Sequence, residues 1–347
     1  MHRLVQTLMM ACLLIAGWCS SGPAESQAQA LNPNHPPTTV RLVFIHHSVG
    51  EGLLNSGLFA QLNTNNYYVT DTYYGWGPDD GGSRIGDHTD TGHWYNWFLG
   101  PSHTTFLTAL YDNTFINESL TNTMPRPSSP NTVVLFKSCY PNSGGISGNP
   151  NDPPRISSPA DSNPIWGADA YNSGAVTVGN IKGLYRDLLS YFATRQDKLF
   201  ILLTPPPVTT GDEFVAGSSD RARAINTWLV NHWLDNYPHN NVAVFDFFNV
   251  LTSNGGNVDT KDLGWTGGNH HRLLEGRVQH VVQIAGNYAA YPSGDSHPTA
   301  AGHLKAAGEF VPLLNVAYHA WQGTGGRPWY MGRSPRSLSA IQLLLMD

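Results

Sequence analysis

The sequence predicts an α/β protein with a mostly parallel β-sheet covered by helices on both faces, that is, a three-layer αβα sandwich. Short apolar runs rich in Val, Ile, Leu and Phe alternate with longer segments whose apolar residues recur at helical spacing. Of the 347 residues 40% are hydrophobic, which is enough for one sizeable core. The expected domain covers residues 39–322.

The alternation gives a specific order of elements. The runs expected to form buried strands are 40–45, 67–74, 132–136, 198–203 and 242–247. The segments expected to form helices are 51–62, 179–194, 219–236 and a last helix that starts after His297-Pro298 and ends near residue 321. The run Pro205-Pro206-Pro207 ends the fourth strand, because proline lacks the backbone N–H that a strand needs.

The two ends of the chain are expected to lie outside the domain. Residues 1–30 resemble an export signal, with a basic start, an apolar run over 8–18 and a plausible cleavage site at 28–30. A lipid anchor on Cys19 is the less favoured alternative. Residues 31–38 are a leader into the fold, and the tail 323–347 has no assigned role. We therefore expect a secreted or periplasmic protein without a membrane span.

Charge and cysteine content exclude some kinds of partner and site. The net charge is −6 and basic residues form no patch, so nucleic acid is not an expected partner. After cleavage at residue 30, Cys139 is the one cysteine left in the sequence, which excludes an internal disulfide and a thiolate metal cluster. The sequence does not indicate an oligomeric state.

A serine follows the first expected strand. In open α/β sheets, ligands bind at the carboxyl ends of the strands, and Ser48 stands there at the start of a helix. Serine at a helix start is also a favoured N-cap, so a purely structural role is the alternative for this residue alone.

A histidine near the other end of the chain favours the catalytic interpretation. In the segment Asp295-Ser296-His297-Pro298, a histidine stands at the start of a helix with a carboxylate two residues before it. A serine nucleophile needs an adjacent base, and that base needs an acceptor that orients it. We expect His297 to be the base for Ser48 and Asp295 to orient His297.

These two segments resemble the first and last conserved blocks of the SGNH/GDSL hydrolases. The first block corresponds to 45–50, where His46-His47 replaces the usual Gly-Asp before the serine, and the last corresponds to 295–302. The likeness in element order extends from about residue 40 to 321. It implies a flavodoxin-like five-stranded sheet and a serine esterase that needs no cofactor or metal.

The resemblance also implies an oxyanion hole built from three donors. They would be the backbone N–H groups of Ser48 and Gly75 and the side-chain amide of Asn142. The segment around Asn142 departs from the family's Gly-x-Asn-Asp, so Ser138 or a backbone N–H nearby is an alternative donor.

Four further residues are expected to contact the substrate, namely His47, Trp76, Tyr140 and His271. For His46-His47 a metal-binding pair is the less favoured alternative, and so is a calcium site at Asp79-Asp80.

These patterns together predict a secreted serine ester hydrolase acting on a small-molecule or polysaccharide ester, most specifically a carbohydrate O-acetyl esterase. The enzymatic alternative is a carbohydrate-active lyase or metal-assisted hydrolase on the same fold. The non-enzymatic alternative is a secreted carbohydrate-binding protein that has lost catalysis.

Overall fold

The computed structural model describes residues 29–115, 120–158, 161–252, 270–282 and 286–332. The chain divides into two compact units, Met1–Ala30 and Leu31–Asp347, and the description below concerns the second unit. The predicted export signal, apart from its last two residues, lies outside the described residues, and so does the part of the predicted tail beyond residue 332.

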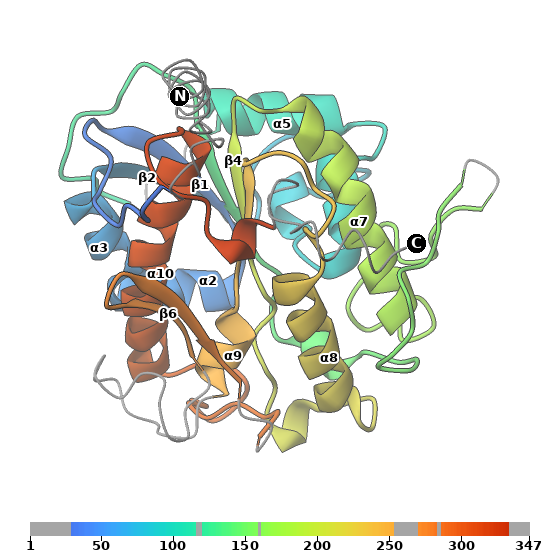
Figure 1. The fold of residues 1–347 in the computed structure, drawn as a ribbon. Coiled ribbons are helices and arrows are strands. Elements are labelled where there is room, and N and C mark those ends of the chain that lie inside the picture. Colours follow the sequence, from blue (N-terminus) through green and yellow to red (C-terminus); the bar gives the residue numbers. More distant parts are fainter. Residues whose placement is uncertain (1–28, 116–119, 159–160, 253–269, 283–285, 333–347) are drawn as a thin grey trace, which may run out of the picture. The chain divides into compact units, whose positions relative to one another are not determined.

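The second unit is built on a five-stranded parallel sheet, which confirms the predicted α/β class (Figure 1). The strand order is β2-β1-β3-β4-β5, so β1 is paired with both β2 and β3, and β5 forms one edge. The strands are β1 Val40–Ile45, β2 Tyr67–Thr72, β3 Val133–Phe136, β4 Leu199–Leu203 and β5 Val242–Phe245. All five lie within the predicted runs.

Helices cover both faces of this sheet. Successive strand residues point to opposite faces, so Val43 and Ile45 belong to one buried cluster and Leu42 and Phe44 to another. The first cluster is completed by α4 Trp94–Phe98, α5 His103–Asp112, α7 Val178–Thr194 and α8 Ser218–Asn231. The second is completed mainly by α2 Ser48–Leu53, α3 Phe59–Thr64, α9 Phe247–Leu251 and α10 Ala300–Trp321.

Two predicted helices differ from the observed ones. The segment predicted as one helix over 51–62 is split into α2, the π-helical η1 Leu54–Leu58 and α3. Gly57 has φ +124°, a conformation that glycine adopts without strain, and it bends the helix at this point. The helix predicted over 219–236 ends as α8 at Asn231, because His232 leaves the helical conformation.

Several elements were not predicted. The antiparallel hairpin of β6 His270–Leu274 and β7 Arg277–Val281 lies in a segment that was expected to be a loop. The remaining short helix is α6 Pro141–Gly144, and the last described element is the 3₁₀ turn η6 Trp329–Met331. Within the described part of the chain, no helix is long and apolar enough to cross a membrane.

Candidate active site

Ser48 is the first residue of α2 and lies directly beyond the carboxyl end of β1. His47 precedes the helix in an extended conformation and caps it without a side-chain hydrogen bond. The helix approaches buried side chains closely, since a Cβ atom at Gly50 would lie 2.3 Å from Cβ of His46. At Gly52 it would lie 2.6 Å from Nε2 of His303. The two glycines therefore let α2 hold Ser48 in this position.

The side chain of Ser48 contacts His297. Oγ of Ser48 lies 2.8 Å from Nε2 of His297, although 249 residues separate them in the sequence. No described backbone N–H donates to this Oγ, so the N-cap alternative for Ser48 is wrong.

His297 is held on its other side by Asp295. Oδ2 of Asp295 lies 2.8 Å from Nδ1 of His297, and Oδ1 accepts the backbone N–H of His297 at 2.8 Å. The intervening Ser296 is buried, accepts the backbone N–H of Thr209 at 2.7 Å and donates to Asp212. These bonds fix the loop before α10 and, with it, the orientation of the imidazole.

The electrostatics of this trio suit proton transfer. The backbone N–H of His297, followed by its ring, holds the pKa of Asp295 below its ordinary value, so the carboxylate is ionised near neutral pH. A hydrogen bond from Nδ1–H to this carboxylate leaves the lone pair of Nε2 facing the hydroxyl of Ser48. The side chains of His297 and Asp295 are 34% and 48% exposed, so substrate and water can reach them.

The register of the sheet brings Cys139 to the same place. Ile45 of β1 is paired with Phe136 of β3, and Ser48 and Cys139 each follow their strand by the same three residues. Sγ of Cys139 lies 3.5 Å from Oγ of Ser48. The sequence alone does not predict this contact, because it depends on the pairing of β1 with β3.

One aromatic ring contacts the trio, and another contacts the neighbouring His47. The ring of Tyr140 meets His297 edge-on, with centroids 4.9 Å apart. The ring of Tyr74, which is 54% exposed, lies 3.9 Å from that of His47. His47 donates from Nε2 to the carbonyl of Gly86 at 2.7 Å, and burial lowers its pKa to about 4. Of the predicted substrate contacts, His47 and Tyr140 thus lie at the site, and Tyr74 was missed.

The predicted oxyanion donors differ in availability. The N–H of Ser48 is in the first turn of a helix and has no acceptor within that helix. The N–H of Gly75 instead donates to Oδ1 of Asp87 at 2.7 Å. The amide of Asn142 is 2% exposed and donates to Asp90 at 2.7 Å and to the carbonyl of Cys139 at 3.2 Å. As the structure stands, Gly75 and Asn142 are not free to bind an oxyanion.

The alternative donor Ser138 is engaged as well. Its Oγ accepts the indole N–H of Trp94 at 3.2 Å and lies 3.1 Å from Oγ1 of Thr91. The side chain is fully buried. The structure therefore places the hydroxyl of Ser138 in the packing around the site and not in its open part.

The remaining predicted residues lie elsewhere. Trp76 is 6% exposed, stacks on Trp97 in the core and donates its indole N–H to the carbonyl of Phe115 at 2.8 Å. His271 is fully buried between Phe245 and Trp329. Neither side chain lines an open site around Ser48, because hydrophobic burial has removed both from solvent.

The two histidines before Ser48 make hydrogen bonds within the fold. Nδ1 of His46 lies 3.0 Å from the carbonyl of His47, and Nε2 lies 3.2 Å from Oδ2 of Asp71. Both nitrogens of His46 are thus occupied, and His47 is bound to Gly86.

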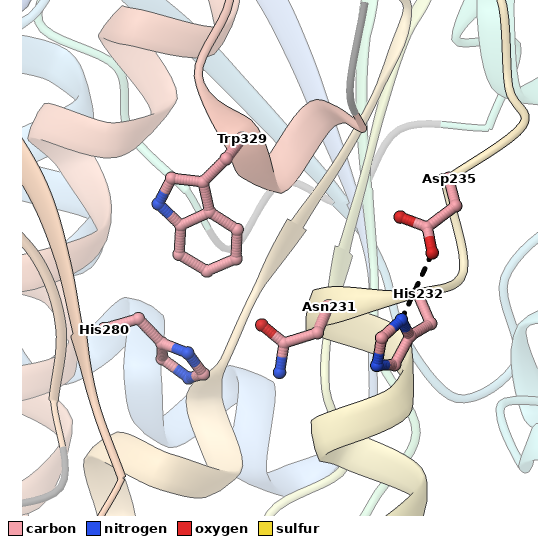
Figure 2. Close-up of a pocket in the computed structure, with 5 residues that line it drawn as sticks. All are labelled: Asn231, His232, Asp235, His280 and Trp329. Carbon is pink, nitrogen blue, oxygen red and sulfur yellow. Dashed lines mark hydrogen bonds and ion pairs between the residues drawn. The ribbon is translucent and has the colours of Figure 1, made fainter. Parts of the chain in front are cut away.

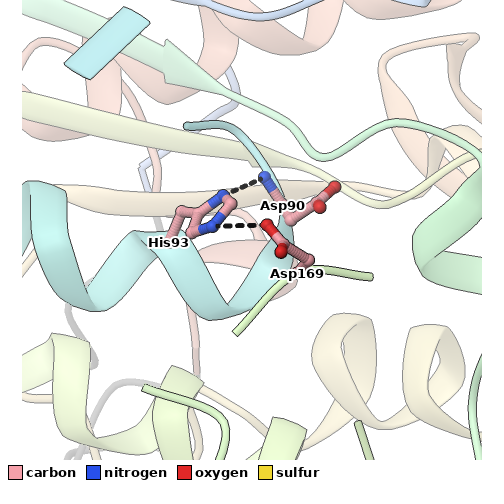
Figure 3. A group of neighbouring side chains, drawn as sticks. All are labelled: Asp90, His93 and Asp169. Carbon is pink, nitrogen blue, oxygen red and sulfur yellow. Dashed lines mark hydrogen bonds and ion pairs between the residues drawn. The ribbon is translucent and has the colours of Figure 1, made fainter. Parts of the chain in front are cut away.

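Three side chains near Asn142 have ligand atoms within 4.8 Å of one another, namely Asp90, His93 and Asp169 (Figure 3). Nδ1 of His93 accepts the N–H of Asp90 at 3.2 Å, and Nε2 lies 3.2 Å from Asp169. The oxygens of Asp90 accept from Asn142 and from the N–H of Ala170. Because these atoms are already hydrogen-bonded, the group fits a structural role that holds Asn142 in place.

No protein-family model matches the sequence, and a search of curated proteins finds no match either.

Proposed function

We propose that this protein is an exported serine ester hydrolase of the SGNH/GDSL type, and specifically a carbohydrate O-acetyl esterase. The observation that supports the proposal is the hydrogen-bonded series from Ser48 through His297 to Asp295, with 2.8 Å at each step. A nucleophile, a base and an orienting carboxylate in this order are what acyl transfer requires.

The proposed reaction has two halves. Oγ of Ser48 attacks the ester carbonyl carbon while Nε2 of His297 takes the hydroxyl proton, and His297 then gives this proton to the leaving alcohol. Water, activated by the same histidine, next attacks the acyl-enzyme and releases the acid. Asp295 stays ionised throughout and stabilises the positively charged imidazole.

The negative charge of the tetrahedral intermediate needs donors that are already in place. The N–H of Ser48 at the start of α2 is the donor that the proposal retains from the sequence analysis. The amide of Asn142 acts indirectly in this proposal, because it accepts the backbone N–H of Thr91 and donates to the side chain of Asp90, and thereby fixes the packing beside the site.

The proposed substrate class follows from the rings around Ser48. Tyr74 and Tyr140 flank His47 and His297, and aromatic faces beside polar groups are suited to the mixed apolar and hydroxyl surface of a sugar ring. The export signal expected over residues 1–30 agrees with a substrate outside the cytoplasm.

The test compares the purified protein with its Ser48→Ala variant on p-nitrophenyl acetate and on acetylated xylan. We expect the wild type to release acetate from both and the variant from neither. Equal rates for the two proteins, or a loss of wild-type activity on chelation, would contradict the proposal and favour metal-assisted chemistry.

A further inference from the structure

A hollow lies between the C-terminal end of α8 and β7. It is lined by Asn231, His232, Asp235, His280 and Trp329 and has a volume of about 530 Å³ (Figure 2). We refer to it as the Trp329 hollow. None of the residues with predicted catalytic roles lines it, and η6, which carries Trp329, packs against the edge strand β5. Ser48 follows β1, and the strands β3 and β4 lie between β1 and β5.

The walls of the Trp329 hollow are aromatic and polar without a free charge. His232 and Asp235 pair with each other at 3.1 Å, and His280 pairs with the buried Asp246 at 2.7 Å. Among the described residues that line the hollow there is no lysine or arginine. A pocket in which each charged group is paired favours an uncharged ligand over a phosphate, a nucleic acid or a cation.

One wall carries the ring of His280. The side chain of His280 is 9% exposed, and Nε2 is directed to Asp246. Among the described residues no group bonds to Nδ1 of this ring. Figure 2 shows the ring below the indole of Trp329, and the two centroids lie 5.3 Å apart. A polar atom next to an aromatic face matches a ligand that has both hydroxyl groups and an apolar face.

The hollow continues beyond the pair His232–Asp235. These two residues also line a neighbouring hollow of about 630 Å³, whose other lining residues include Trp228, Tyr237 and Arg186. Arg186 is paired with Asp187 at 2.9 Å, so this charge is paired as well. The two hollows share the pair His232–Asp235, and we refer to them together as the groove. Trp329 lines one hollow and Trp228 the other.

We propose that this groove, from Trp329 across His232–Asp235 to Trp228, binds a neutral polysaccharide chain at a site separate from Ser48. Indole faces supply stacking surfaces for sugar rings, and Asn231, Asp235 and His280 supply hydrogen-bond partners for hydroxyl groups. Binding here holds the protein on its polymer while the Ser48 centre acts elsewhere on the chain. The ligand proposed for this groove is of the same class as the proposed esterase substrate. Binding in the groove does not require that the Ser48 centre hydrolyse esters.

The test is affinity electrophoresis of the Ser48→Ala protein in native gels that contain xylan, glucomannan or mixed-linkage β-glucan. We expect at least one polymer to retard the protein. Trp329→Ala is expected to raise the dissociation constant roughly tenfold through the loss of stacking. Trp321→Ala is the matched control, because Trp321 is also partly exposed but lines neither hollow.

Trp329 also packs against the core, so a second variant keeps the test valid if Trp329→Ala unfolds. Asn231→Ala changes a partly exposed side chain at the end of α8 and is expected to raise the dissociation constant about threefold to tenfold. Retardation by none of the polymers, or equal retardation of the Asn231 variant and its parent, overturns the proposal. Hydrolysis of p-nitrophenyl acetate by Asn231→Ala in the wild-type background should stay within about twofold, which separates this site from the esterase.

Discussion

Two histidine–aspartate pairs in this protein have nearly the same geometry and very different surroundings. His297 and Asp295 are 2.8 Å apart, and their side chains are 34% and 48% exposed. His280 and Asp246 are 2.7 Å apart, and their side chains are 9% and 3% exposed. The first pair faces the hydroxyl of Ser48, whereas Asp246 of the second accepts the backbone N–H of Asn249 and caps α9.

The difference shows which surroundings suit such a pair to proton transfer. An exposed pair next to a hydroxyl can exchange protons with substrate and water, and its loss leaves little buried charge behind. A buried pair joins β5, α9 and the hairpin, and its loss leaves an unpaired charge in the core. Burial alone would raise the pKa of Asp246, but the hydrogen bond and charge of His280 outweigh it, so the pKa lies below its usual value.

The largest expected effect is a loss of activity when the exposed pair His297–Asp295 is broken. His297→Ala removes the base, and kcat/KM on p-nitrophenyl acetate should fall by about 10³-fold or more. The thermal unfolding midpoint should change by less than about 3 °C, because His297 is partly exposed. His232→Ala, which removes an exposed histidine of another pair, is the control, and a fall of similar size there would contradict the assignment.

The next largest expected effect is a loss of stability when the buried pair His280–Asp246 is broken. Asp246→Ala should lower the free energy of unfolding by about 3–5 kcal/mol, because it leaves His280 without its partner and α9 without its cap. Urea denaturation followed by circular dichroism measures this change. The fraction that remains folded should keep the wild-type kcat/KM, and a selective loss of activity would show that the two pairs are not independent.

The matched substitution in the exposed pair should have the reverse profile. Asp295→Ala is expected to lower kcat/KM about 100-fold, less than in sites where this carboxylate is buried, because water can partly replace an exposed group. The free energy of unfolding should change by less than about 0.5 kcal/mol. Unfolding of the protein by Asp295→Ala but not by Asp246→Ala would show that the exposed pair, and not the buried one, stabilises the fold.

A smaller effect concerns pH. Burial, followed by the charge of Lys137, lowers the pKa of His303 to about 4, below its value of about 6.5 in the unfolded chain. The unfolded state therefore takes up the proton first, so the contribution of His303 to stability is constant above about pH 6.5 and falls as the pH drops from 6.5 toward 4. At pH 5 this histidine should account for about 2 kcal/mol of the loss.

His303→Leu tests this linkage. Urea midpoints at pH 7.5 and pH 5 should differ less for this variant than for the wild type. His232→Leu, at an exposed histidine, should leave the difference unchanged. An unchanged difference in the His303 variant as well would show that this residue does not contribute to acid sensitivity.

The same contrast between exposed and buried groups explains how much could be predicted from the sequence. The strands, their parallel class and the candidates Ser48, His297 and Asp295 were predictable, because each depends on a local pattern. The contact between Ser48 and His297 was inferred from the chemistry that a serine nucleophile requires, and the structure confirms it at 2.8 Å.

The predictions that depended on the surroundings of a side chain were less successful. Gly75 and Asn142 were expected to be free donors, but Asp87 and Asp90 accept their hydrogen bonds. Both acceptors lie between residues 75 and 100. The apolar residues of this stretch follow neither helical nor strand spacing, so its fold could not be predicted from the sequence. Trp76 lies in the same stretch. It was expected to contact the substrate, but it is buried in the core.

The hairpin shows a second limit. Its strands, His270–Leu274 and Arg277–Val281, contain charged and polar residues of the kind that is common in solvated loops. The hairpin is held in place by the packing of His271 against Phe245 and Trp329, which are far from it in the sequence. A single sequence carries no signal for such contacts, and the groove next to His280 was missed with them.

The most direct test of the central claim is labelling with a fluorophosphonate probe, followed by peptide mapping. The wild type and Cys139→Ala should both be labelled once, at Ser48, because Sγ of Cys139 is a neighbour of Oγ at 3.5 Å and not the nucleophile. Ser48→Ala should not be labelled. Labelling of Ser48→Ala at another residue, or a wild type that hydrolyses esters without being labelled at Ser48, would contradict the account.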